Sequence, residues 1–212
     1  MEKELEKAVS ALREGGVVLY PTETFYAIGC AAQCEGAIRR VFALKRRPAG
    51  MPLPLILGSP EQLGMAADVP GELADDVHAL AGLWPAPLTL LLPASRSLPP
   101  LLTAGSGRIA VRVSAHPVAQ ALAIQGGTPI ISTSANISGK QAVTAARSLD
   151  QELVQALLPA DCILDLPPAP AGGAPSTIAE PLGGGRLRVL RPGAFDLQPL
   201  ARLGFTIVQE RT

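Results

Sequence analysis

Several groups of polar residues each follow a short apolar run, which is where open α/β sheets usually bind their ligands. Residues 20–26 (YPTETFY) supply two threonine hydroxyls and the Glu23 carboxylate. Residues 131–140 (ISTSANISGK) supply four hydroxyls and the Asn136 amide. Small polar side chains and free backbone N–H groups of this kind can cradle an anion. An ordinary turn or loop is the alternative for each group.

Five cations gather near the end of a predicted helix: Arg39, Arg40, Lys45, Arg46 and Arg47. Because Arg47 precedes Pro48, we expect it to leave the helix in an extended conformation and to point away from Lys45. The two cations then approach an anion from different sides, and arginine suits bidentate contacts with phosphate. The alternative is a solvated helix end whose cations match the helix dipole.

Arg112 interrupts the apolar run 109–113, and a cation in a buried strand is costly unless it is paired. A bound carboxylate, Asp165 or another internal acid would serve as its partner. Two further segments, 175–178 (PSTI) and 191–193 (RPG), each place a small polar group or a cation beside a proline. Either of these segments alone is a weak signal.

Other kinds of chemistry lack support. The sequence has no phosphate-loop or dinucleotide-binding glycine pattern, no HExxH and no cluster of metal ligands. Its two histidines, His78 and His116, lie in unremarkable contexts, which argues against a histidine-dependent triad. Basic and acidic residues balance at 18 each, so the chain is not a globally basic nucleic-acid binder. A local basic patch stays open.

The cellular setting is also suggested by composition. Three cysteines, an odd number at low density, suit a reducing compartment. No run approaches the roughly 20 apolar residues of a membrane helix, and no apolar stretch follows the charged N-terminus as in a signal peptide. We therefore expect a soluble, cytoplasmic protein that does not contact a membrane.

Predicted strands and helices alternate along the 212 residues, which indicates an α/β fold in a single domain, 1–212. High glycine and proline contents, 21 of each, favour a mixed sheet. The apolar patterns predict helices at 5–12, 37–45, 72–83, 117–124 and 151–157. They predict strands at 17–20, 53–57, 88–92, 109–113, 130–131, 162–166, 177–179 and 187–190. Pro54 favours an edge position for its strand, and residues 148–151 suggest a capping box.

Five segments, in this order, resemble the motifs of the YrdC-like (Sua5/YciO/YrdC) family. Those motifs are YPT-[ED]-T-x-Y-x-x-G, K-x-R-P, S-x-N within STSAN-x-SG, P-[ST]-T and a terminal RPG. In this chain they fall at 20–29, 45–48, 132–139, 175–177 and 191–193. The resemblance covers residues 5–195 and indicates the short, single-domain form of the family.

The resemblance implies a twisted, mixed α/β sheet with flanking helices and a concave, positively charged cavity. It also implies the reaction of the threonylcarbamoyl-AMP synthases, which convert L-threonine, bicarbonate and ATP into threonylcarbamoyl-adenylate and pyrophosphate. Mg²⁺ would accompany the ATP, and no metal site in the protein itself is expected. The product would feed the t6A modification of tRNA through separate transferase proteins, and direct RNA binding stays open.

Motif positions also imply roles for individual residues. Lys45 and Arg47 would hold the ATP phosphates and act as the catalytic residues. The nucleotide would also contact Asn136, Thr144 and Arg191. The threonine would lie among Thr24, Arg112, Ser134 and Ser176, with Arg112 on its carboxylate and Ser132 lining the same pocket.

Several positions depart from the family pattern. Met51 stands where Asn or Lys is frequent, and Ile56 where many members carry a threonine-binding His. A lost hydrogen bond to a charged group is worth about 1.5–3 kcal/mol, so a nucleotide-binding paralogue with altered or lost threonine specificity is the alternative. Ser114 replaces a common proline, and Arg108 a small polar residue. A third hypothesis, an RNA-binding module built on Arg39–Arg47, is disfavoured by zero net charge and few aromatic residues.

Overall fold

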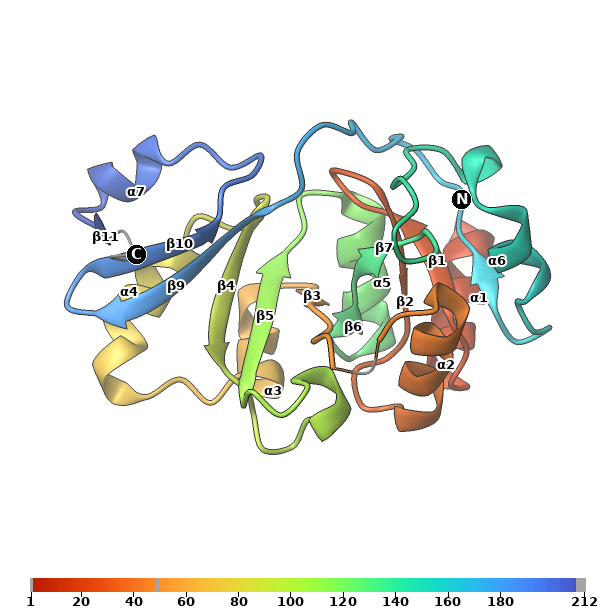
Figure 1. Ribbon diagram of the computed structural model, residues 1–212, viewed down its shortest axis with the longest axis horizontal. Coiled ribbons are helices and arrows are strands. Elements are labelled where there is room, and N and C mark those ends of the chain that lie inside the picture. Colours follow the sequence, from red (N-terminus) through yellow and green to blue (C-terminus); the bar gives the residue numbers. More distant parts are fainter. Residues whose placement is uncertain (1, 49, 209–212) are drawn as a thin grey trace.

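The computed structural model describes residues 2–48 and 50–208, which form two β-sheets with flanking helices (Figure 1). The helices are α1 (Glu2–Arg13), α2 (Glu35–Lys45), α3 (Leu63–Ala66), α4 (Gly71–Ala81), α5 (Pro117–Gly126), α6 (Gln151–Gln155) and α7 (Gln198–Arg202). The strands are β1 (Val18–Pro21), β2 (Tyr26–Gly29), β3 (Leu55–Leu57), β4 (Leu88–Pro93), β5 (Arg108–Val113), β6 (Ile130–Ile131), β7 (Thr133–Ser134), β8 (Cys162–Ile163), β9 (Thr177–Gly183), β10 (Arg186–Arg191) and β11 (Thr206–Val208). The predicted α/β class is confirmed. Within the described ranges, no helix is long and apolar enough to cross a membrane.

The strands divide between two sheets rather than forming one. The small sheet has the order β7-β2-β1-β8, and the large sheet has the order β11-β10-β9-β4-β5-β3-β6. In Figure 1 the large sheet fills the left and middle of the view, and the small sheet lies on the right. Each sheet mixes directions: β1 is antiparallel to β2 and parallel to β8, whereas β5 is antiparallel to β4 and parallel to β3. The predicted mixed character is therefore confirmed.

The two sheets meet where the chain leaving β2 passes β6. Ala31 forms an isolated bridge with Ile130, and the Ile131 N–H donates to the Cys30 carbonyl at 2.9 Å. A Cβ atom at Gly29 would lie only 1.7 Å from the Ile131 carbonyl oxygen, so a larger residue cannot occupy this position unchanged. The glycine that ends the 20–29 motif thus allows the halves of the molecule to join.

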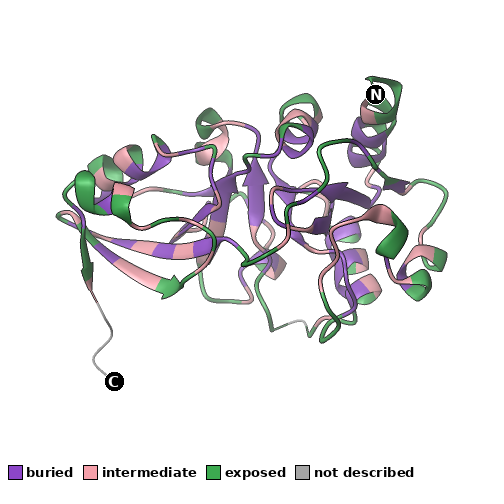
Figure 2. Ribbon diagram, turned by 90° about the horizontal axis from the view of Figure 1, so that it is seen from above, coloured by how far each residue is buried: buried purple, intermediate pink, exposed green. Residues whose placement is uncertain are grey.

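Two apolar clusters form the core, which appears as the buried interior of Figure 2. The larger cluster joins both sheets to α2 and α4, and the smaller packs α1 and α5 against β1 and β3. Buried and half-buried residues alternate along β9, which packs one of its faces toward α4. Apolar burial of this extent is expected to supply most of the stability that fixes the cavity walls.

Details of the predicted secondary structure are wrong at three places. Pro54 lies before β3 and not in it, so its missing N–H does not restrict the strand, and β3 is an interior strand between β5 and β6. Asp150, rather than Ser148, caps α6, because its side chain accepts a hydrogen bond from the Glu152 N–H. The strand predicted at 162–166 is shorter. Within the described residues β8 pairs with β1 alone, and β1 ends at a proline that has no N–H.

Five elements escaped the sequence patterns altogether: β2, α3, β7, α7 and β11. β2 lies inside the polar motif 20–29, whose side chains suggested a loop. β7 has two residues and α7 has five, which is too short to show a periodic apolar pattern.

Candidate active site

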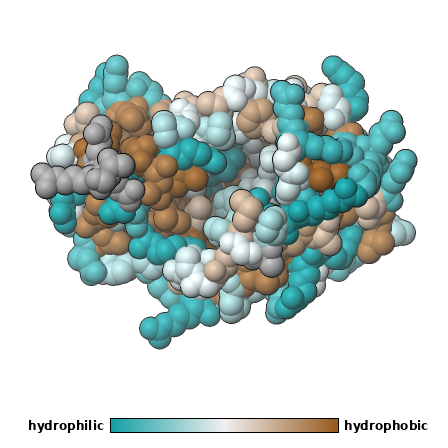
Figure 3. All heavy atoms as spheres, viewed as in Figure 1, coloured by the Kyte–Doolittle hydropathy of each residue, from teal (hydrophilic) through white to brown (hydrophobic). Residues whose placement is uncertain are grey.

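A cavity of about 640 Å³ lies between the two sheets and receives side chains from both. The space-filling view shows the molecular face hollowed near its middle (Figure 3). Six of the nine predicted site residues line this cavity: Thr24, Arg47, Arg112, Ser134, Ser176 and Arg191. Ser132 lines it as well. Segments far apart in the sequence therefore converge on one site.

Lys45 is not among the cavity-lining residues. Its side chain is 2% exposed, and its ammonium donates hydrogen bonds to the Asn136 carbonyl at 2.7 Å and to the Ser134 carbonyl. Burial, with a smaller contribution from the charge of Arg47, lowers its pKa to about 8. Lys45 therefore holds the backbone of the S-x-N segment, and its contact with the ATP phosphates stays a prediction.

Asn136 closes the same segment. Its Nδ2 donates to the Ile137 carbonyl at 3.0 Å and to the Lys140 carbonyl at 2.6 Å. Its Oδ1 atom is buried and has no hydrogen-bond partner among the described residues. Asn136 does not line the main cavity, although the neighbouring Ser134 does. A buried acceptor without a partner is rare in folded proteins, so this oxygen is available to a ligand or a water.

Arg47 faces the cavity, as its position before Pro48 led us to expect. Arg46 ends α2 in the left-handed conformation, with φ 49°, and thereby redirects the chain. The Arg47 Nη2 donates to the Pro52 carbonyl at 2.9 Å, whereas its Nε is buried and finds no partner in the described part of the chain. Burial lowers the pKa of the Arg47 guanidinium. An unpaired donor at the cavity wall suits an anionic ligand.

Arg112 has an internal acid as its partner. Its Nε lies 2.9 Å from Glu23 Oε1, and the Ser114 hydroxyl donates to Glu23 Oε2. Asp165 is not the partner, because it accepts the Tyr26 hydroxyl at 2.5 Å. Burial alone would raise the pKa of Glu23, but the Arg112 charge and the Ser114 hydrogen bond hold it below its ordinary value.

The two weak proline-flanked segments form a single unit. The Arg191 Nη2 donates to the Ser176 carbonyl at 2.8 Å, and the hydroxyls of Ser176 and Thr89 lie 2.9 Å apart. A Cβ atom at Gly193 would lie 2.2 Å from the Pro175 carbonyl oxygen, so glycine permits the close packing of these segments. Their juxtaposition places a hydroxyl and a guanidinium at the same wall of the cavity.

Three positions singled out by sequence differ in their relation to the cavity. Thr144 does not line it, and a Cβ atom at Gly172 would lie 3.2 Å from the Thr144 methyl. Met51 lines it and is 45% exposed. Ile56 is fully buried in the smaller apolar cluster. The expectation that Ile56 costs a substrate contact is therefore not supported, because this side chain serves the core.

Sequence reasoning missed the carboxylate partner of Arg112 and the place of Arg108, which lines the cavity and forms an ion pair with Glu180 at 2.5 Å. The presence of Glu23 in the 20–29 motif was the one indication of this partner in the sequence. It does not show which strand the carboxylate faces. The apolar part of the wall, which includes Leu91 and Ala110, was also missed.

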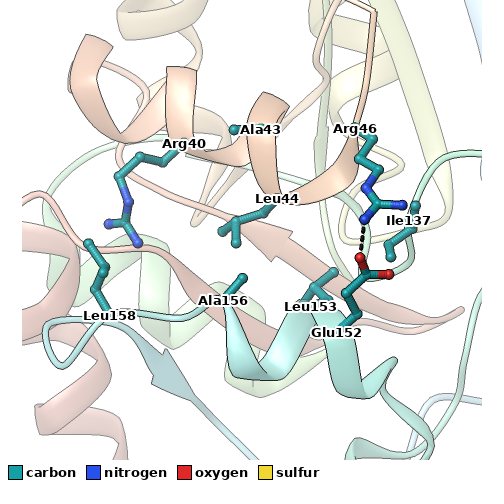
Figure 4. Close-up of a pocket in the computed structure, with 9 residues that line it drawn as sticks. All are labelled: Arg40, Ala43, Leu44, Arg46, Ile137, Glu152, Leu153, Ala156 and Leu158. Carbon is teal, nitrogen blue, oxygen red and sulfur yellow. Dashed lines mark hydrogen bonds and ion pairs between the residues drawn. The ribbon is translucent and has the colours of Figure 1, made fainter.

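A second cavity, of about 380 Å³, lies between α2 and α6 (Figure 4). Arg46 reaches across it to form an ion pair with Glu152, and Arg40 at its other end pairs with Asp161. Arg39 also pairs with an acid, within α2. The cation cluster of the sequence is thus dispersed and largely neutralised, which argues against its use as one RNA-binding surface.

Solved structures define the class of fold. Pyrococcus abyssi Sua5 in complex with L-threonine matches with a TM-score of 0.85 and 34% identity, over 98% of this chain and 60% of that one. Escherichia coli YciO matches with a TM-score of 0.75 and 24% identity, over 94% of each chain, which supports the fold alone. The arrangement of sheets and helices is therefore the one found in Sua5 and YciO.

Proteins similar in sequence indicate the same family as the solved structures. The threonylcarbamoyl-AMP synthase of Psychromonas ingrahamii is 36% identical over 190 residues, which are 88% of this chain and 97% of that protein. The enzyme of the same name from P. abyssi is 36% identical over 203 residues, and this chain spans 57% of its length. The profile of the Sua5/YciO/YrdC family, described as telomere recombination, matches residues 10–193. The chain belongs to this family.

Proposed function

We propose that the protein is an enzyme that forms threonylcarbamoyl-AMP and pyrophosphate from L-threonine, bicarbonate and ATP. The reaction transfers a nucleotidyl group. Relatives that carry the name threonylcarbamoyl-AMP synthase, and a related structure that holds L-threonine, support this function. The structural observation that carries it is the convergence of four arginines on one cavity, namely Arg47, Arg108, Arg112 and Arg191, of which Arg108 is paired with Glu180.

The reaction asks little of general acid–base catalysis. The threonine amine and bicarbonate form an N-carboxylate and release water. One oxygen of that N-carboxylate attacks the α-phosphorus of ATP, and the bond to the departing pyrophosphate breaks. Because the nucleophile is already an anion, no strong base has to remove a proton from it. The protein must instead bring several anions together and stabilise charge on the phosphate oxygens.

The polar groups of the cavity suit these tasks. We assign Arg47 and Arg191 to the phosphates and Arg112 to the threonine carboxylate. Ser176, together with Thr24 and Ser134, would bind the polar groups of threonine. Within the described ranges, the buried Oδ1 of Asn136 and Nε of Arg47 lack partners, and both belong to motif residues assigned to the nucleotide. Binding of ATP would satisfy such groups, which is why we retain both residues in the nucleotide site.

Magnesium fits as part of the nucleotide substrate. Across residues 2–48 and 50–208, no group of three or more His, Cys, Asp or Glu side chains could hold a metal ion. The Glu23 carboxylate, which lies close behind the cavity wall, is engaged by Arg112 and Ser114. We therefore propose that Mg²⁺ enters on the ATP phosphates, where it offsets their charge.

The deciding experiment measures pyrophosphate release from MgATP with each of threonine and bicarbonate present or omitted. Release that requires both, with an adenylate of the expected mass among the products, supports the proposal. Serine and allo-threonine serve as matched controls for the side chain. ATP binding without threonine-dependent release would instead favour the paralogue with altered specificity, and Met51 would then be the first position to change.

The product has a reactive mixed anhydride, so we propose that it passes to separate transferase proteins that modify tRNA. We propose a cytoplasmic location on the same ground. A direct contact with RNA would require cations other than the α2 cluster, whose arginines are largely paired.

A further inference from the structure

Glu23 is the one carboxylate of the 20–29 motif, and neither the catalytic chemistry nor the substrate contacts use it. Its neighbours Thr22 and Thr24 line the main cavity, but Glu23 does not. Its side chain is 12% exposed and lies behind Arg112. A carboxylate that faced the cavity would repel anionic substrates. The presence of Glu23 directly behind the cavity wall therefore needs a different role.

The contact with Arg112 is made through one nitrogen. Among the described residues, the side-chain hydrogen bonding of Arg112 is confined to its Nε, which lies 2.9 Å from Glu23 Oε1. The guanidinium is planar and rigid, so a hydrogen bond at Nε fixes the plane of the whole group. Both Nη atoms then keep their donors for a ligand. The two parallel donors of such a fork match the two oxygens of a carboxylate.

Glu23 is itself fixed on both sides. The Ser114 hydroxyl donates to Glu23 Oε2 and accepts the His116 N–H at 3.2 Å. The backbone carbonyl of Glu23 accepts the Ala171 N–H at 3.2 Å, from the segment that connects β8 to β9. These contacts hold Glu23 in place independently of Arg112, so its carboxylate can act as a fixed point.

We propose that Glu23 is a positioning residue, which, with Ser114 as its support, orients the guanidinium of Arg112 for the carboxylate of the amino-acid substrate. The inference rests on the proposed function. Beyond the proposed function, this inference says which residues give the protein its affinity for the amino acid. Ser114 is of particular interest, because the family pattern commonly has a proline at this position and a proline cannot donate to Glu23.

The test compares Glu23→Gln with Glu152→Gln, which removes the carboxylate of an exposed Arg–Glu pair outside the main cavity. For Glu23→Gln we expect the KM for threonine to rise about tenfold, as the loss of one charged hydrogen bond predicts. The KM for ATP and kcat should change less than about twofold, and Glu152→Gln should match the wild type in all three constants. A purely structural role would instead change the three constants together.

Two further variants sharpen the result. Glu23→Asp keeps the charge, so it should recover part of the threonine affinity that Glu23→Gln loses. Adding Glu23→Gln to Arg112→Lys should raise the threonine KM by less than about twofold beyond Arg112→Lys alone, because residues acting through one contact are not additive. Full additivity of the two changes would overturn the proposal.

Ser114→Ala is the alternative variant if Glu23→Gln fails to fold. It removes only the hydroxyl that donates to the Glu23 carboxylate. We expect the threonine KM to rise about threefold, within the range of a neutral hydrogen bond, while the ATP KM stays unchanged. If wild-type protein shows threonine-dependent release and neither variant alters the threonine KM, only the positioning role is overturned. If the wild type shows no such release, the proposed function fails first.

Discussion

The two walls of the cavity use cations in opposite ways. On the small-sheet side, Lys45 does not line the cavity, and its ammonium donates to two main-chain carbonyls, which holds the S-x-N segment in place. On the large-sheet side, Arg112 and Arg191 line the cavity, and an acid or a carbonyl behind each of them fixes it. A lysine or arginine near the site can therefore either hold the backbone of a cavity wall or line the cavity itself. The burial of its charged group distinguishes these two roles.

The largest effect is expected for Lys45→Ala, which should damage both stability and activity. The buried Asn136 carbonyl would lose its donor, at a cost of about 1–3 kcal/mol, whereas the Ser134 carbonyl would keep the Asn136 N–H at 2.9 Å. Turnover should fall at least ~100-fold, because the wall that faces the nucleotide loses its shape. Urea unfolding and pyrophosphate release measure the two effects.

Lys140→Ala is the matched control, since its ammonium pairs with Asp150 at the surface and should contribute little. If Lys45→Ala abolished activity and left the free energy of unfolding unchanged, Lys45 would belong with the residues that contact substrate.

Arg47→Ala should separate the two effects. We expect turnover to fall about 100-fold, as after loss of a preorganised charge contact. The free energy of unfolding should change by less than about 1 kcal/mol, because the hydrogen bonding of this side chain to the described residues is confined to the Pro52 carbonyl. Arg39→Ala, on the exposed face of α2, is the control. Equal losses of stability in the Lys45 and Arg47 variants would erase the contrast between the two.

Arg191→Ala tests the large-sheet wall. Its guanidinium lies at the cavity edge and donates to the Ser176 carbonyl. Its removal should raise the KM for ATP about tenfold, because about this much affinity is lost with one charge-assisted hydrogen bond. Thermal unfolding should hardly change, as is usual for an exposed side chain. Arg202→Ala on α7 provides a control of equal charge. A rise confined to the threonine KM would move Arg191 to the amino-acid side.

The smallest effect is a pH dependence of stability. Lys45 has a pKa of about 8 in the folded protein, below the ordinary value of 10.5. Between these two values the unfolded chain binds more protons at this site, so the free energy of unfolding should rise with pH. Denaturant unfolding at pH 7.5 and 9.5 should show a larger increase for the wild type than for Lys45→Met. An identical increase in both proteins would mean that burial does not lower this pKa.

The sequence predicted the features of the fold that depend on the local spacing of residues. The order of apolar runs gave the α/β class, and Pro48 correctly separated the directions of Arg47 and Lys45. Motif resemblance grouped residues that the fold then gathered around one cavity, including Thr24 and Ser176.

What escaped prediction depends on contacts between distant segments. The junction between the two sheets depends on the close approach of Gly29 to Ile131, which no local pattern encodes. The partner of Arg112 could not be chosen among internal acids, because the choice depends on how β5 lies against residues 20–26. Burial of Lys45 was hidden for the same reason, since the carbonyls that bind it come from a segment about 90 residues away.

The place of Lys45 also has a consequence for chemical labelling. The free amine of a lysine attacks acylating reagents, and a lowered pKa raises the fraction of free amine near neutral pH. Basicity alone would make Lys45 a favoured target among the four lysines of the chain. Its 2% exposure beneath the S-x-N segment shields it, however, so modification requires that segment to lift. The rate at which Lys45 acquires a label therefore reports how often this wall of the cavity opens.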